Sequence, residues 1–181
     1  STGIPACFVS HSPAMLAFGS DGTLLVGTGD AATFGVVDAG GLYPDCFGPD
    51  RLDPSEDIGA FRAQRIESLA GKILRIDPAT GLGLPSNPFF TGDSTDNASR
   101  VWAYGVRNSF RFAVRDGGSP EPDSARPGTI IAGDVGWRVW EELNVIRGGE
   151  DMGWPCWEGP APHPDYQVAT PATNGCAGQP P

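Results

Sequence analysis

The chain has 181 residues, a net charge of −10 at pH 7 and 39% hydrophobic residues. Its length and hydrophobic content predict one globular domain with its own core, and its acidic balance argues against a nucleic acid or an anionic membrane as partner. No apolar run approaches the roughly 18 residues of a membrane span. The 26 glycines and 18 prolines predict many turns and few helices.

Alternating apolar and polar residues predict short strands along most of the chain. Residues 14–30 give two of them, joined by the turn Ser20-Asp21-Gly22-Thr23. Residues 61–70 predict one short helix, between long loops rich in Gly, Asp and Pro. The later strands are expected at 71–77, 100–104, 110–115, 129–134 and 141–146.

The sequence contains an internal repeat, in which one set of short segments occurs twice. The segments LAF, DGTLLV and GD within 16–30 recur as FAV, GTIIA and GD within 112–134, and each copy leads to another strand. Such a repeated meander predicts an all-β fold, a β-propeller of four-stranded antiparallel blades. A β-sandwich would also give short strands, but it does not require the same phrase twice.

The four cysteines are Cys7, Cys46, Cys156 and Cys176. No pair has the Cys-x-x-Cys spacing of a zinc site, and an even number indicates disulfides formed in an oxidising compartment. We favour the pairs Cys7–Cys46 and Cys156–Cys176, because each closes a loop within one half of the chain. Buried free thiols are the alternative. Disulfides predict a secreted protein, extracellular or periplasmic.

The polar pair Arg107-Asn108 lies between two predicted strands. A loop at the end of a sheet is where a rigid scaffold commonly carries its chemistry. Arg presents a fixed fork of donors that suits carboxylates or phosphates, and Asn adds one donor and one acceptor direction. The alternative is that Arg107 only holds the loop in place.

Several motifs, in chain order, resemble those of the soluble quinoprotein glucose/sorbosone dehydrogenase family: GKILRID, PSNPF at 85–89, RVWAYGVRNSFRF, GDVGW with EELN, and GGEDMGWP. The resemblance runs from His11 to about Gly159. It implies a six-bladed β-propeller whose members oxidise sugars with pyrroloquinoline quinone (PQQ), held with a calcium ion on the top face. A related animal branch uses the same fold for protein binding without redox chemistry.

The resemblance makes His11, five residues before Leu16, the general base and Asp30 its partner. Oxidation of a sugar hydroxyl removes a proton as hydride leaves carbon, and an imidazole suits that proton near neutral pH. A carboxylate beside it would hold the imidazole tautomer and stabilise its cation. The resemblance also places Arg107 and Asn108 on the cofactor, whose carboxylates and developing quinone charge suit a cationic fork.

For calcium, the resemblance points to the backbone carbonyls of Gly136 and Trp137, before the EELN strand, and calcium accepts carbonyl oxygens readily. This chain differs from the glucose-oxidising members of the family at two positions. Those members have Gly-Pro where this chain has Gly136 and Trp137, and they have a Gln where this chain has Phe110. Further acidic candidates are Glu141 and Glu142 near that loop, and Asp93 and Asp96 for a structural calcium.

Aromatic residues are frequent in the second half of the chain. Most of the tryptophans are expected to pack within blades, although some could stack on a sugar or on the cofactor. They are Trp102, Trp137, Trp140, Trp154 and Trp157. His163 has no partner motif and is expected at the surface.

Residues 1–181 are expected to form a partial propeller of two to three blades. Residues 1–99 would be a first blade unit, 100–159 a second unit and the start of the next, and 160–181 a Pro/Gly-rich tail. The remaining blades would come from the same precursor or another chain. The predicted function is PQQ-dependent oxidation of an aldose or sorbosone-type sugar, with an external electron acceptor. The alternative is a non-catalytic propeller that binds carbohydrate or a protein partner.

Overall fold

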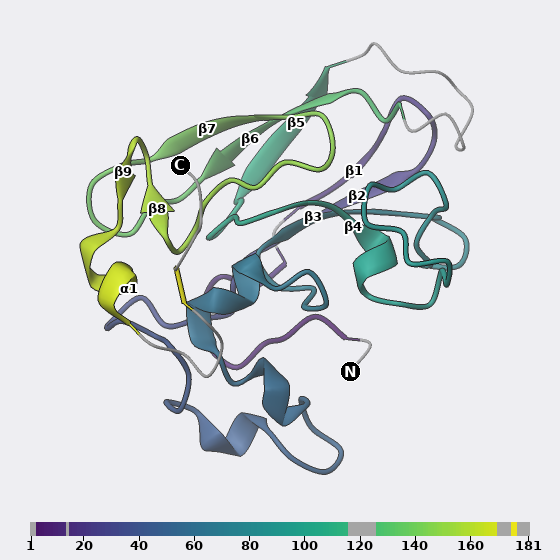
Figure 1. The fold of residues 1–181 in the computed structure, drawn as a ribbon. Coiled ribbons are helices and arrows are strands. Elements are labelled where there is room, and N and C mark those ends of the chain that lie inside the picture. Colours follow the sequence, from purple (N-terminus) through teal and green to yellow (C-terminus); the bar gives the residue numbers. More distant parts are fainter. Residues whose placement is uncertain (1–2, 14, 116–125, 170–174, 177–181) are drawn as a thin grey trace.

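The computed structural model describes residues 3–13, 15–115, 126–169 and 175–176. Two antiparallel sheets of consecutive strands dominate it (Figure 1). The first sheet has the order β1 (Met15–Phe18), β2 (Leu24–Thr28), β3 (Lys72–Ile76) and β4 (Val101–Tyr104). The second has the order β5 (Arg111–Arg115), β6 (Thr129–Asp134) and β7 (Glu142–Ile146).

These sheets confirm the predicted all-β meander and are two blades of a partial β-propeller. Each strand lies close to its predicted bounds. The first blade has the expected four strands, whereas the second has three within the described residues. Of the tail predicted at 160–181, residues 170–174 and 177–181 lie outside the described part of the chain.

The two blades pack face to face around one apolar core. Met15 and Ala17 of β1 pack against it, whereas the alternate residues Leu16 and Phe18 are exposed, as the two-residue period of a strand requires. The backbone N–H of Phe112 in β5 donates to the Met15 sulfur at 3.2 Å, so β1 and β5 are neighbours. The buried core residues are Leu25, Ile73, Trp102, Ala103, Phe112, Ile130, Ala132 and Ile146.

Short elements fill the connections. The 3₁₀ helices are η1 (Pro44–Cys46), η2 (Pro54–Glu56), η3 (Gly59–Gln64) and η4 (Ala98–Arg100). A two-stranded ribbon of β8 (Trp157–Glu158) and β9 (Ala161–Pro162) precedes the one α-helix among the described residues, α1 (Pro164–Val168). No helix within those residues is long and apolar enough to cross a membrane.

The short helix predicted over 61–70 is wrong in type and length. The chain instead forms the 3₁₀ helix η3, which ends at Gln64. Carbonyls near its end accept hydrogen bonds from a residue beyond the helix: the Lys72 ammonium donates to the Arg62 and Ala63 oxygens at 2.8 and 2.9 Å. The helix ends because Arg65 takes an extended backbone conformation, with φ −87° and ψ 113°, and Lys72 completes the hydrogen bonding of these end carbonyls.

One rim of the sheets collects the connections that carry the predicted site residues. In an antiparallel meander, the start of β1 and β5 and the end of β2, β4 and β6 lie at the same edge. The segment after β7 then returns along the outer strand of the first blade, where Gly149 N–H donates to Trp102 O at 2.8 Å. It reaches the rim as Trp154 N–H donates to Gly105 O at 2.9 Å.

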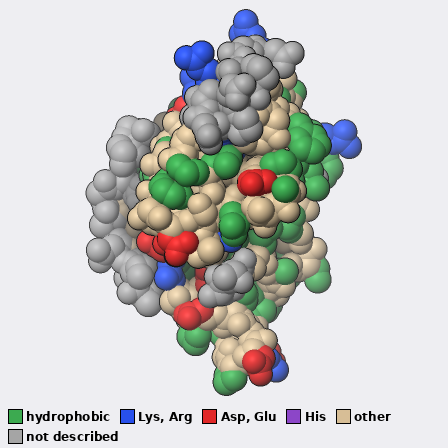
Figure 2. Space-filling model, turned by 90° about the vertical axis from the view of Figure 1, so that its right-hand side faces the viewer, with side chains coloured by type: hydrophobic (Ala, Val, Ile, Leu, Met, Phe, Trp, Pro, Cys, Tyr) green, Lys and Arg blue, Asp and Glu red, His purple; other side chains and the backbone are tan. Residues whose placement is uncertain are grey.

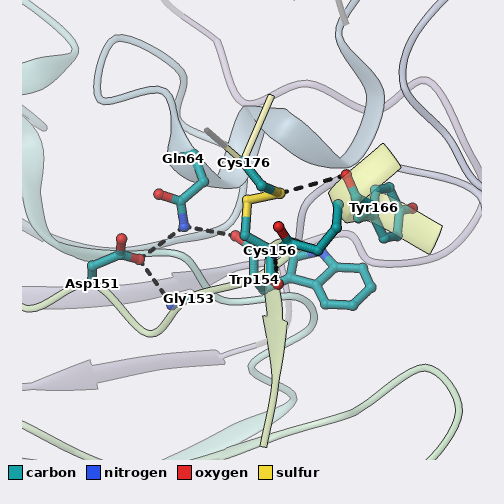
Figure 3. Close-up of a disulfide and its surroundings, with 8 residues drawn as sticks. Gln64, Asp151, Gly153, Trp154, Cys156, Tyr166 and Cys176 are labelled. Carbon is teal, nitrogen blue, oxygen red and sulfur yellow. Dashed lines mark hydrogen bonds between the residues drawn. A yellow bond between two sulfur atoms is a disulfide. The ribbon is translucent and has the colours of Figure 1, made fainter. Parts of the chain in front are cut away.

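A disulfide holds Cys176, the last described residue, against this rim. Cys156 and Cys176 are bonded, which confirms one predicted pair, and Figure 3 shows the bridge beside Trp154 and Tyr166. The other predicted pair is wrong, because Cys7 and Cys46 are free thiols. They are neighbours nonetheless: burial raises the pKa of Cys7 to about 12, and a hydrogen bond with Cys46 adds to the shift.

Apolar side chains remain on the outside of both blades. Leu16 and Phe18 of β1 are 65% and 67% exposed, and Leu143 of β7 is 75% exposed. Figure 2 shows hydrophobic side chains in several groups on one side of the molecule. Sheet faces of this kind are normally covered by a further layer.

Candidate functional site

Asp30 is the centre of the site. Its carboxylate is 1% exposed, and each of its oxygens has a side-chain partner. Oδ1 lies 2.7 Å from His11 Nδ1 and accepts Ala32 N–H at 3.0 Å. Oδ2 accepts the indole N–H of Trp154 at 2.7 Å. Since a carboxylate only accepts, the proton of His11 is assigned to Nδ1, which leaves the lone pair on Nε2 as a base.

The backbone holds His11 in a conformation that few residues adopt. His11 has a φ of 56°, and Ala31, next to Asp30, has a φ of 55°. Ala31 N–H donates to His11 O at 3.3 Å. The His11 main chain lies so close to Gly29 that a Cβ at Gly29 would stand 2.2 Å from that oxygen. Such strained positions cluster at functional sites, where the surroundings impose them.

Arg107 and Asn108 reach the same place from the loop between β4 and β5. Arg107 N–H donates to Asp134 Oδ2 at 2.8 Å, and Asn108 N–H donates to Oδ1 at 2.6 Å. The Arg107 carbonyl accepts Asp30 N–H at 2.8 Å. His11 and Asp30 are thus in contact, and the backbone of the Arg107-Asn108 loop lies against Asp30 and Asp134. The roles expected for these residues stay predictions.

The Arg107 guanidinium is buried, but not all of its N–H groups have a hydrogen-bond partner. It is 4% exposed, with Nη1 donating to Val135 O at 3.0 Å and to Gly136 O at 3.1 Å. Its Cζ lies 5.2 Å from the ring centre of Trp154, a cation–π contact. Its Nε has no hydrogen-bond partner. An unpaired buried donor costs free energy, and the cavity lined by Arg107 is the size of one water molecule.

Asp134 is a titratable group that sequence analysis did not single out. Burial raises its pKa to about 7, against the backbone N–H groups of Arg107 and Asn108, which lower it, while Glu142 and Asp30 raise it further. The small cavity beside it, about 10 Å³, is the size of one water molecule. Asp134 is the last residue of β6, and Asp30 lies two residues after β2; each follows a Gly in the repeated segment. The sequence repeat was therefore the signal that could have found Asp134.

The carbonyl predicted to bind calcium at Gly136 is already an acceptor for Arg107. A calcium ion on that oxygen would stand beside a guanidinium, cation against cation. The Trp137 N–H donates to Glu158 Oε1 at 2.6 Å, and its ring stacks on His163 at 5.1 Å. In this arrangement the Gly136 carbonyl does not fit a calcium site.

The further acidic candidates are occupied by local hydrogen bonds. Glu141 accepts Gly136 N–H at 3.1 Å, and Glu142 accepts Gly159 N–H at 2.6 Å. Asp93 and Asp96 accept from Thr95 and Thr91 within one exposed loop. Within the described ranges, no group of three or more His, Cys, Asp or Glu residues is arranged to hold a metal ion.

His163 was predicted at the surface, and this is wrong. It is 2% exposed, stacked on Trp137 and edge-on to Trp154 and Tyr166. Burial lowers the pKa of His163, although Glu158 nearby acts in the opposite direction. The cluster forms where the segment after β7 returns along β4 and meets Trp137 at the rim, a long-range contact that no local sequence pattern shows.

A sequence model of the glucose/sorbosone dehydrogenase family matches residues 8–175. The chain belongs to this family. Among its relatives, the HIPL1 protein of Arabidopsis thaliana is 31% identical over 173 residues, which are 87% of this chain and 20% of the relative. The HIPL2 protein of the same plant is 33% identical over 165 residues, 83% of this chain and 19% of the relative.

Solved structures show the same likeness. The PQQ-bound aldose sugar dehydrogenase of Streptomyces coelicolor matches with a TM-score of 0.58 and 31% identity, over 87% of this chain and 34% of that one. A Thermus thermophilus oxidoreductase described as a glucose dehydrogenase matches with a TM-score of 0.60 and 28% identity, over 91% of this chain and 40% of that one. The chain thus spans only 34% and 40% of the lengths of these two proteins.

Proposed function

We propose that this chain is the catalytic part of a PQQ-dependent sugar dehydrogenase. The observation that carries the proposal is the direct link between the base and the pair Arg107-Asn108, which we call the cofactor arm. His11 and Asp30 are joined by a 2.7 Å hydrogen bond, and Asp30 N–H is bonded to the carbonyl of Arg107. The family and the solved neighbours, which are sugar dehydrogenases, support this assignment.

Each side chain has a role that its contacts suit. His11 Nε2 accepts the hydroxyl proton of the sugar, while Asp30 holds the Nδ1 proton and stabilises the imidazolium that forms. Arg107 and Asn108 bind the cofactor; once the guanidinium turns outward, its now buried and unpaired Nε is a donor for a carboxylate or a quinone oxygen. The bound quinone supplies the hydride acceptor, and an external acceptor takes the two electrons.

Further parts of the proposal rest on the resemblance. Calcium would bind near Gly136 only after Arg107 Nη1 releases that carbonyl. The remaining blades would cover exposed apolar positions such as Leu143 on β7. The disulfide between Cys156 and Cys176 favours an extracellular or periplasmic location.

The test uses the intact polypeptide that contains this chain. The protein is incubated with PQQ and calcium, and oxidation of glucose and other aldoses is followed with an artificial electron acceptor. We expect His11→Gln to bind the quinone but to turn over at least about 100-fold more slowly, because a general base contributes this much. Asp77→Asn, in the turn after β3 at the sheet edge opposite the rim, is the control and should keep the wild-type rate.

Arg107→Lys separates binding from proton transfer. Lys lacks the planar fork, so we expect weaker quinone binding, measured by titration, with turnover at saturating quinone much less affected than in His11→Gln. If quinone binds the wild-type protein and no sugar is oxidised, the enzyme assignment fails.

The second candidate is a non-catalytic propeller that binds carbohydrate or a protein partner. The observation that favours it is the occupied Gly136 carbonyl, together with Phe110, which is 55% exposed beside the cofactor arm. Saturable sugar binding that is the same with and without PQQ, in a protein without turnover, would select this candidate.

A further inference from the structure

Trp154 touches both halves of the candidate site. Its indole N–H donates to Asp30 Oδ2 at 2.7 Å, across 124 residues of sequence. Its ring lies under the Arg107 guanidinium, 5.2 Å from Cζ to the ring centre. The residue is 4% exposed. The Trp154 side chain therefore connects the Asp30 carboxylate to the Arg107 guanidinium.

The surroundings hold this indole from several sides. Its backbone N–H donates to Gly105 O at 2.9 Å, and its carbonyl accepts the Gln64 amide at 2.9 Å. Gln64 is held in turn by Asp151 at 2.8 Å (Figure 3). Trp137 and Tyr166 pack against its ring edge-on. Because these contacts fix the indole ring, its N–H keeps pointing at Asp30 Oδ2.

That direction matters for Asp30, because rotation about the terminal bond of an Asp side chain is soft. A hydrogen bond to Oδ2 stops the rotation and keeps Oδ1 facing His11 Nδ1. We propose that Trp154 is a positioning residue, whose N–H fixes the Asp30 carboxylate and so keeps the His11 proton on Nδ1. As a role in sugar oxidation this rests on the proposed function; as a statement about the tautomer it does not.

Trp102 is a matched control within the same fold. It is 3% exposed, and the Arg75 guanidinium lies over its ring at 5.3 Å, so its burial and cation–π contact are close to those of Trp154. Its indole N–H, however, has no hydrogen-bond partner. Trp102→Phe and Trp154→Phe thus remove similar volume and aromatic contact, and only the second removes a hydrogen bond to Asp30.

The test is made on the intact protein without quinone or sugar. Histidine is labelled with ¹⁵N, the His11 signals are assigned with His11→Gln, and the spectrum is recorded at pH about 8.5, above the ordinary range of histidine titration. We expect a protonated Nδ1 in wild type and in Trp102→Phe. In Trp154→Phe the signals should shift towards a mixture of the two tautomers. A spectrum of Trp154→Phe that matches the wild type overturns the proposal.

A second variant covers the case in which Trp154→Phe does not fold. Incorporation of 3-benzothienylalanine at Trp154 keeps the bicyclic ring and replaces the N–H by sulfur, so its tautomer result decides in place of the phenylalanine variant. With quinone and an aldose present, both variants should lower kcat about tenfold, the effect of one hydrogen bond, with KM within about twofold. If the wild-type protein oxidises the sugar and the His11 spectrum of the variants is unchanged, only the positioning role of Trp154 is refuted. If the wild-type protein oxidises no sugar, the proposed function is refuted, and the tautomer result still decides the role of Trp154.

Discussion

Gly29→Ala tests whether the backbone around Asp30 places His11. A Cβ on Gly29 would stand 2.2 Å from His11 O, 2.5 Å from His11 C and 2.7 Å from His11 Cα. Since ordinary contact begins at 3.4 Å, the oxygen must retreat by about 1.2 Å, and backbone cannot rotate away as a flexible side chain does. A shift of that size breaks the 2.7 Å bond between His11 and Asp30.

The expected magnitudes follow from that displacement. Overpacking of this kind costs about 1–3 kcal/mol in the free energy of unfolding, and misplacing a reacting group by about 1 Å lowers turnover about 100-fold. Gly133→Ala is the matched control. Gly133 precedes Asp134 as Gly29 precedes Asp30, but the nearest atom to its added Cβ is Arg111 O at an ordinary 3.7 Å.

Both quantities are measured on the intact protein, by denaturant unfolding and by quinone-dependent aldose oxidation. Gly29→Ala should have a lower free energy of unfolding and a lower turnover than Gly133→Ala. Equal stability and equal turnover of the two variants would refute the inference that the close approach of Gly29 sets the position of His11.

The remaining predictions concern pH and stability. The raised pKa of Asp134, about 7 against 3.8, means that the folded protein holds a proton there which the unfolded chain has released. The stability of the wild type relative to Asp134→Asn should therefore fall as pH rises from about 4 to 7, by about 4 kcal/mol in metal-free protein; a pH-independent difference contradicts this. Replacing Cys156 and Cys176 by Ser should cost about 3 kcal/mol of unfolding free energy, whereas Cys7→Ser, at a free thiol, should cost little; a reducing agent that leaves the melting temperature unchanged would contradict the first. Asp21→Asn removes the buried partner of Arg75, 2.8 Å away with both side chains 0% exposed, and should cost about 3–5 kcal/mol in chemical denaturation; an unchanged denaturation midpoint would show that the ion pair is replaceable and the expectation wrong.

The regular part of the fold was predictable because its determinants are local. Alternation indicates a strand, and β6 shows this directly, with Ile130 and Ala132 buried and Ile131 between them half-buried. The repeat then indicated the blade architecture. The helix predicted at 61–70 failed because the chain becomes extended at Arg65, and the Lys72 ammonium that bonds the end carbonyls lies outside the window that periodicity considers.

The site was predictable where a motif carried it and not where the contact is long-range. His11 and Asp30 were identified by the family resemblance, and Arg107 and Asn108 also by their place between two predicted strands. The structure bonds Asp30 to His11 and to the Arg107 backbone. Trp154 was visible only as one tryptophan of a motif, since its bond to Asp30 depends on how the chain returns along β4. The same return of the chain buries His163, and no spacing in the sequence indicates it.

The most direct test of the account is an experimental structure of the intact protein with bound PQQ. We expect the quinone to bind on the rim that carries His11 and Asp30, with Arg107 and Asn108 as donors to its oxygens. Quinone bound to another face, or on this rim without any contact from Arg107, would contradict it.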